Sequence, residues 1–342
     1  MVGIGEKTEL FTKQKRQRIA YIDVAKGIVI FLMVVGHSYS KPNNIITYIY
    51  SFHMPFFFLI SGVLYGYRVQ NGGHLILNFN RKVKTLLLPY VIWGALYKLF
   101  LAVFQIIGGG RVSDTLLKNG KEFIELKSGA MWFLPVMFIA FLIFLFIYKM
   151  KKVGYVIFVV IMFIGMLAPE TNNPYLDALY RAFVGSGFIV IGFYGCKVFQ
   201  YRMSGPALGV LFAINLFLVF INGKVDLLTR VFHNYILYVI VACVGSYLLL
   251  SFARLLTEHL GSKKWVEKIE YAGKSSIEIL CLHMFVIEVC RFLDYKIMGN
   301  ILSQLGIFEG IIIALIVYLL LVLVLPYSSR YIAFTFGKNN AY

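Results

Sequence analysis

The chain has 342 residues, of which 60% are hydrophobic and 14% are charged, and its mean hydropathy is +0.78. In an average soluble domain roughly a quarter of the residues are charged. This composition therefore excludes an ordinary soluble globular protein, a disordered protein and a fibrous protein. It predicts an all-α fold, a polytopic transmembrane helical bundle with one membrane domain.

A transmembrane helix needs about twenty mostly apolar residues, and about ten stretches of the chain meet this requirement. They cover residues 21–38, 47–67, 85–107, 130–148, 153–168, 176–196, 205–221, 231–253, 275–293 and 307–326. The fifth stretch is short and the ninth contains charged residues, so nine and ten spans both fit. We expect a basic N-terminal segment at 1–18, the membrane domain at 19–330 and a tail at 331–342.

The net charge of +17, from 33 basic and 16 acidic residues, fits either a nucleic-acid partner or a bias of basic residues toward cytoplasmic loops. If the N-terminus is cytoplasmic, the cytoplasmic segments hold 21 Lys and Arg residues and the outer loops hold eight. This distribution predicts that both termini are cytoplasmic. It also explains most of the net charge without nucleic acid.

Three ionisable residues interrupt the first span, where such groups are costly and often functional. Asp23 and Lys26 are three residues apart, and His37 follows Lys26 by about three helical turns, so all three share one face. The helical rise places His37 roughly 16 Å from Lys26, toward the outer half of the membrane. A salt bridge at the inner interface with a histidine near the outer headgroups fits the same spacing.

Two further histidines lie within spans. His53 is close to the outer end of the second span, and a short loop allows it to approach His37. His283 lies roughly 12 Å into the ninth span. A lone histidine in a span can simply be a hydrogen-bonding group of the packing, whereas three that converge indicate chemistry. No pair has the spacing of metal ligands on one helical turn, so we predict no metal site.

Arg81 and Lys84 lie three residues apart just before the third span. Their spacing fits two interpretations, simple anchoring on the cytoplasmic side and a clamp for phosphate groups.

Several segments in this order match a known family. They are RIAYIDVAKGIVIFLMVVGH, SFHMPFFFLISG, FNRKVKTLLLPY, MWFLPVMF, GFIVIGFYGCK and AGKSSIEILCLH, and they extend from Arg18 to His283. On these motifs the chain resembles the acyltransferase-3 family of integral membrane O-acyltransferases, and in particular its fucose 4-O-acetylase-like, exopolysaccharide-modifying branch. The resemblance implies ten spans, an N-terminus inside, and transfer of an acyl group from acyl-CoA to a hydroxyl.

The resemblance also implies roles for individual residues. His37 matches the family's essential first-span histidine, and His283 matches its late histidine. Lys26 stands where the larger branch has Arg, and Arg81 with Lys84 matches a basic pair in which Lys replaces one Arg. Trp132 lies in the matching WFL motif. Leu280 replaces a frequent Tyr, so a hydroxyl role at that position is lost.

These features predict a catalytic group of His37, Asp23, His53 and His283. Acetyl-CoA is expected as a co-substrate held by Lys26, Arg81, Lys84 and Trp132, with no permanently bound cofactor.

In this scheme His37 acts as a general base or carries the acyl group, Asp23 orients Lys26, and His53 orients His37 or binds the acceptor. The expected acceptor is a cell-surface glycan or lipid-linked sugar, and the expected location is the bacterial plasma (inner) membrane, in contact with its lipids. Oligomeric state stays open. The alternatives are an exporter or flippase of such glycans without acyl transfer, and a sensor or assembly partner without turnover.

Overall fold

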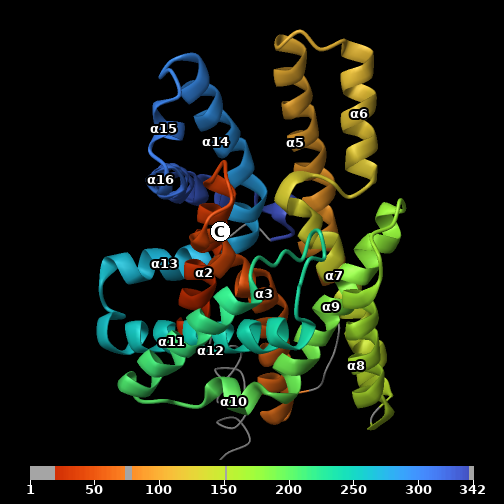
Figure 1. The fold of residues 1–342 in the computed structure, drawn as a ribbon, viewed down its shortest axis with the longest axis vertical. Coiled ribbons are helices and arrows are strands. Elements are labelled where there is room, and N and C mark those ends of the chain that lie inside the picture. The colour runs from red at the N-terminus through yellow and green to blue at the C-terminus, as the bar shows by residue number, and fades with distance from the viewer. Residues whose placement is uncertain (1–19, 74–78, 151, 339–342) are drawn as a thin grey trace, which may run out of the picture.

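The computed structural model describes residues 20–73, 79–150 and 152–338, and this part of the chain is almost entirely helical (Figure 1). The first half contains α2 (Ala20–Ser38), α3 (Asn44–Gln70), α4 (Phe79–Lys82), the π-helical turn η1 (Val83–Leu87), α5 (Leu88–Ile107), α6 (Val112–Ile124), the 3-10 turn η2 (Gly129–Trp132), α7 (Phe133–Lys149) and α8 (Lys152–Leu167). The second half contains α9 (Pro174–Tyr194), α10 (Cys196–Gln200), α11 (Gly205–Asn222), α12 (Tyr235–Leu260), α13 (Lys264–Lys274), α14 (Ser276–Lys296), α15 (Ile301–Gln304), α16 (Ile307–Tyr331) and the 3-10 turn η3 (Ala333–Phe336). The predicted basic segment at 1–18 lies outside the described residues.

The described residues hold 8 helical segments that are long and apolar enough to cross a membrane. Two of the ten predicted spans are not among them. The fifth corresponds to α8, whose apolar part, Val156–Leu167, is short. The ninth corresponds to α14, which carries Glu278, Glu288 and Arg291 along its length. The all-helical, multi-span class is confirmed, while the number of spans and the side of the termini stay predictions.

Several predicted boundaries are displaced, three of them in the last two spans that the structure retains. The eighth span begins at Tyr235 and not at residue 231, because Asp226 and Val231 pair their backbones in an antiparallel bridge. It then continues to Leu260, so much of the predicted inner loop is helical, as the end of α12 and α13. The last helix runs through Pro326 to Tyr331.

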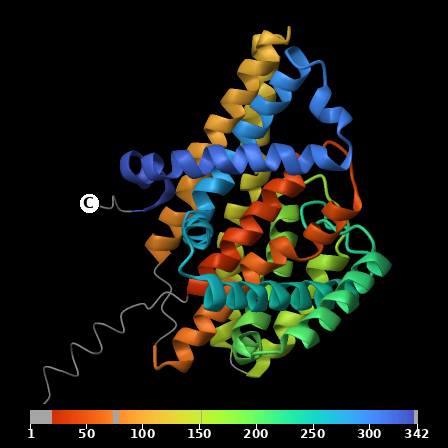
Figure 2. The ribbon, with the colours of Figure 1, turned by 90° about the vertical axis from the view of Figure 1, so that its left-hand side faces the viewer.

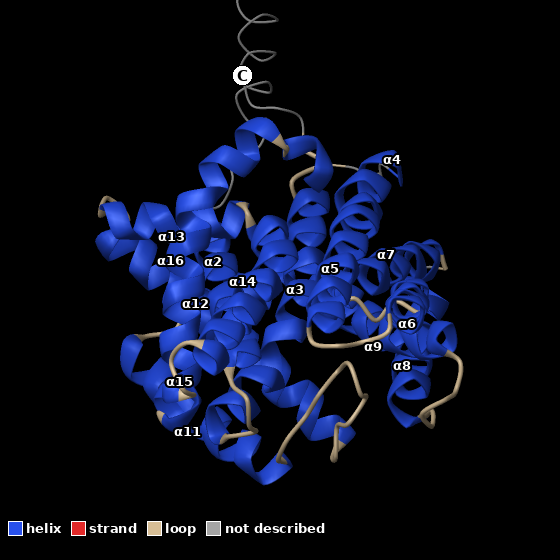
Figure 3. Ribbon diagram, turned by 90° about the horizontal axis from the view of Figure 1, so that it is seen from above, coloured by secondary structure: helices blue, strands red, loops and turns tan. Residues whose placement is uncertain are grey.

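Helix α2 lies in the middle of the molecule, packed against α3, α12, α13, α14 and α16. Seen from above, α2, α14 and α3 occupy the centre, and α16 lies across the bundle in the side view (Figures 2 and 3). Helix α13 crosses α2 without intervening side chains, since a Cβ on Gly273 would lie 1.8 Å from the carbonyl oxygen of Asp23. This close crossing fixes the end of α2 that carries Lys26.

After α16 the chain packs against the rest of the protein as far as residue 338. Phe336 is fully buried and stacks on Trp93 at 5.1 Å between ring centroids. Lys338 places its ammonium 2.7 Å from a carboxylate oxygen of Glu278, a side chain that is completely buried. The predicted tail at 331–342 is therefore part of the packed membrane domain as far as residue 338.

Candidate active site

The polar groups of α2 lie at its two ends, separated by apolar residues. At the N-terminal end the Lys26 ammonium is 3.2 Å from a carboxylate oxygen of Asp23, which is almost fully buried. His37 is the penultimate residue of the helix. His37 follows Asp23 by fourteen positions, which is a rise of roughly 21 Å along the helix, so the carboxylate cannot contact the imidazole. Its partner is Lys26, as the sequence predicts.

The structure brings the three predicted histidines together. The rings of His37 and His283 are 5.4 Å apart between centroids. Tyr50 lies between His37 and His53, at 6.3 Å from the first and 4.8 Å from the second. These residues come from α2, α3 and α14, so two consecutive helices and a third that is distant in sequence build one cluster.

Two of the histidines have a defined proton position. The Nδ1 atom of His53 is 2.9 Å from the carbonyl of Ile49, and Nδ1 of His283 is 3.0 Å from the carbonyls of Ile279 and Leu280. A carbonyl oxygen only accepts hydrogen bonds, so both Nδ1 atoms donate and both Nε2 atoms are left as acceptors. His53 and His283 are buried, whereas His37 is partly exposed. His37 is therefore the most exposed of the three histidines.

His37 opens into a narrow cavity of about 50 Å³, which we call the histidine cavity. Its wall contains the polar side chains His37, Tyr50, His53, Trp132 and Asp226. In the described part of the chain no group of three or more His, Cys, Asp or Glu residues is arranged to hold a metal ion. The histidines and Asp226 can take part in proton transfer, and all five side chains can form hydrogen bonds.

A second cavity of about 570 Å³, the basic cavity, lies beside it. Four cationic side chains contribute to its wall: Lys26, Arg68, Arg81 and Lys82. The rest is mostly apolar, with residues of α2, α3, α7 and α14. Its volume is in the range of small-molecule sites, and its cations suit an anionic ligand such as a phosphate ester.

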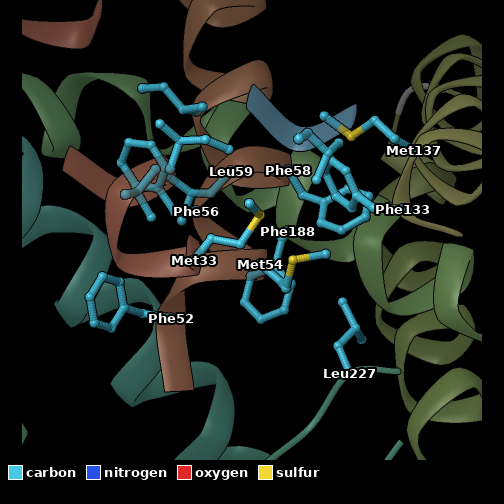
Figure 4. Packing of buried hydrophobic residues seen from close by; sticks show 14 of the residues in the cluster. Met33, Phe52, Met54, Phe56, Phe58, Leu59, Phe133, Met137, Phe188 and Leu227 are labelled. Atoms are coloured by element: carbon cyan, nitrogen blue, oxygen red, sulfur yellow. The ribbon is translucent and has the colours of Figure 1, made fainter. Parts of the chain in front are cut away.

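The two cavities share three wall residues, Met33, Met54 and Leu280. Met33 and Met54 lie side by side in the core (Figure 4). Methionine side chains are flexible and adapt to the shape of a ligand. Two of the three side chains at the junction between the basic cavity and the histidine cavity are therefore of this adaptable kind.

Comparison with known proteins agrees with this geometry. A family model described as an acyltransferase domain matches residues 19–330. The chain belongs to this acyltransferase family. Neither the comparison with curated proteins nor that with solved structures found a match. The chain is thus a membrane acyltransferase. Its two cavities are the candidate binding sites for the acyl donor and the acyl acceptor.

The structure places the predicted donor-binding residues of this acyltransferase in different surroundings. Lys26 and Arg81 are in the wall of the basic cavity, but Lys84 is exposed and outside it, and Lys82 takes its place. The prediction for Lys84 assumed a regular α-helix. The turn at Val83–Leu87 is π-helical, so residues three apart no longer share a face. Trp132 belongs to the histidine cavity and not to the basic one.

Arg68, Lys82 and Tyr50 were not predicted as site residues, and neither were Arg291 and Asp226. Arg291 donates to the carbonyl oxygens of His37 at 3.1 Å and Tyr39 at 3.3 Å, and so provides hydrogen-bond partners for backbone carbonyls at the C-terminal end of α2. Its spacing of eight residues from His283, about two helical turns, was a usable signal. Asp226 enters the histidine cavity from the loop between α11 and α12, where no periodicity marks it.

Proposed function

We propose that this acyltransferase moves an acetyl group from acetyl-CoA to a hydroxyl of a cell-surface glycan or lipid-linked sugar, as a multi-pass protein of the bacterial inner membrane. The observation that carries the proposal is the contact between a basic cavity and a histidine cavity through Met33, Met54 and Leu280. A donor with anionic phosphates, a long thin arm and a reactive thioester at its tip matches such a pair of cavities.

In this proposal the phosphates of CoA bind Lys26, Arg68, Arg81 and Lys82 at the cytoplasmic mouth. Arg offers a planar fork that fits two phosphate oxygens, while Lys acts as a point charge. The pantetheine arm passes the methionines and Leu280, and the thioester then lies next to His37.

The transfer step uses His37 as a general base. The acceptor hydroxyl oxygen attacks the thioester carbonyl while His37 takes the hydroxyl proton. The C–S bond breaks as the ester C–O bond forms, and the proton then passes to the departing CoA thiolate. Arg291 holds the carbonyl of His37, and the ring of His283 packs beside the base, so the imidazole is positioned before the substrate arrives.

The test is a comparison of wild-type protein with the His37→Ala variant. Membranes from expressing cells are incubated with radiolabelled acetyl-CoA, and glycans from the same cells are analysed by mass spectrometry. We expect labelled glycan and a mass increase of one acetyl group with the wild type, and neither with the variant. If the wild-type protein exports glycan but releases no CoA from acetyl-CoA, it is an exporter and not an acyltransferase of this kind.

A further inference from the structure

The histidine cavity has one wall that the proposed donor does not explain. This wall belongs to the loop 223–234 between α11 and α12, which contributes Asp226, Leu227 and Leu228. The junction with the basic cavity involves other residues, on α2, α3 and α14. The loop therefore lines a part of the cavity that does not belong to the junction.

The loop is held firmly in this position. Arg230 is buried, and its guanidinium donates to the carbonyls of Ala168 and Pro169 at 2.6 and 2.7 Å and to Asp177 at 2.9 Å. Arg181 donates to the carbonyl of Leu228 at 2.7 Å. Two arginines thus tie the loop to the start of α9 and to the segment before it, and the side chains that face the cavity are fixed in place.

The carboxylate of Asp226 is built into this loop through one of its two oxygens. Its Oδ1 accepts a hydrogen bond from the backbone N–H of Leu228 at 2.8 Å. This hydrogen bond does not use Oδ2. The side chain is partly exposed and shares the wall with the hydroxyl of Tyr50 and the indole of Trp132. A carboxylate, a hydroxyl and a large aromatic ring together suit a polyol, which has hydroxyls to donate and apolar C–H faces.

We propose that Asp226 binds the acceptor, accepting a hydrogen bond from a sugar hydroxyl next to the one that is acetylated. This inference rests on the proposed function and extends it to the acceptor side. Asp226 fixes the acceptor against the loop while the attacking hydroxyl faces His37. It takes no proton from the reacting oxygen and has no part in binding CoA.

The experiment compares Asp226→Asn with the wild type. An asparagine can keep the loop hydrogen bond, because its Oδ1 also accepts from the N–H of Leu228. Its Nδ2 group then faces the cavity with donors only, so it cannot accept from a hydroxyl. The control is Asp114→Asn, which removes the same charge from an exposed position on α6.

Membrane vesicles from cells expressing each variant supply the acceptor, and radiolabelled acetyl-CoA is the probe. We expect Asp226→Asn to lower label transfer to glycan by about tenfold or more, the effect of losing a charged hydrogen bond. Binding of CoA to the purified variant stays within about twofold of the wild type, and Asp114→Asn behaves as wild type in both measurements.

Two results would overturn the proposal. The first is transfer at the wild-type rate by Asp226→Asn. If Asp226→Ala is impaired while Asp226→Asn is not, the proposal also fails, because the side chain would then only maintain the shape of the loop. The other is an equal loss of CoA binding and transfer, which would show a general structural role. If the wild-type protein itself transfers no label, the proposed function has failed and not the assignment of Asp226.

Discussion

Replacing Arg81 by Ala is expected to raise the acetyl-CoA concentration needed for half-maximal turnover about tenfold. The Arg81 guanidinium is one of four cationic groups in the wall of the basic cavity, together with those of Lys26, Arg68 and Lys82, and in the proposed mode of binding it contacts the phosphates of CoA. A hydrogen bond to a charged group contributes about 1.5–3 kcal/mol, or roughly 10- to 150-fold in affinity. Arg81 is exposed to solvent, so we expect the lower end of this range.

The matched control is Lys84→Ala. Lys84 lies three residues further along the chain and carries the same charge, but its side chain is exposed and outside the cavity wall. Initial rates of CoA release are measured against acetyl-CoA concentration at low and at raised salt. We expect Lys84→Ala to stay within about twofold of the wild type, and the difference between the two variants to shrink as salt screens the exposed charge. Equal effects of both substitutions, or none for Arg81→Ala, would show that the phosphates do not bind in this cavity.

Two further predictions concern the catalytic cluster and the C-terminal segment. His37→Ala should lower the maximal rate of CoA release by about 10²- to 10⁴-fold, which is the usual contribution of a general base. CoA binding should be unchanged. A maximal rate close to that of the wild type would show that His37 is not the general base. Lys338→Ala should destabilise the protein by about 1–3 kcal/mol, because it leaves the buried Glu278 carboxylate without its ammonium partner. Thermal unfolding of the purified protein measures this effect, and adding Glu278→Gln should restore part of the stability; an unchanged melting temperature for Lys338→Ala would contradict it.

The sequence was a good guide to regular helices and to residues placed by helical spacing. Asp23, Lys26 and His37 lie along one helix as the spacing requires, and Asp23 pairs with Lys26. The approach of His53 to His37 followed from the short loop between their helices. The approach of His283 could only be anticipated as one possibility, because it depends on how α14 packs against α2.

Irregular backbone explains most of what could not be predicted. The π-helical turn at Val83–Leu87 moves Lys84 out of the cavity wall and brings Lys82 in. The bridge between Asp226 and Val231 turns a predicted helix start into a loop that carries Asp226 to the histidines. Neither feature has a periodic pattern in the sequence.

The packing of the C-terminal segment was missed for a related reason. Residues 331–338 are short and partly polar, and a composition of this kind suggests a solvated tail. Their burial depends on partners far away in the sequence, Trp93 for Phe336 and Glu278 for Lys338.

The central claim is that the two cavities form one route for the acyl group, and the junction at Leu280 tests it most directly. Leu280→Trp places a larger ring between the basic cavity and His37, and Leu293→Trp makes the same change at an exposed position on the same helix, where Leu293 is 40% exposed. For each variant, CoA binding and label transfer from acetyl-CoA are measured on the same preparation. We predict that Leu280→Trp binds CoA like the wild type but transfers little or no acetyl group. Leu293→Trp should bind CoA and transfer the acetyl group like the wild type. Wild-type transfer by Leu280→Trp would contradict the route through the bundle.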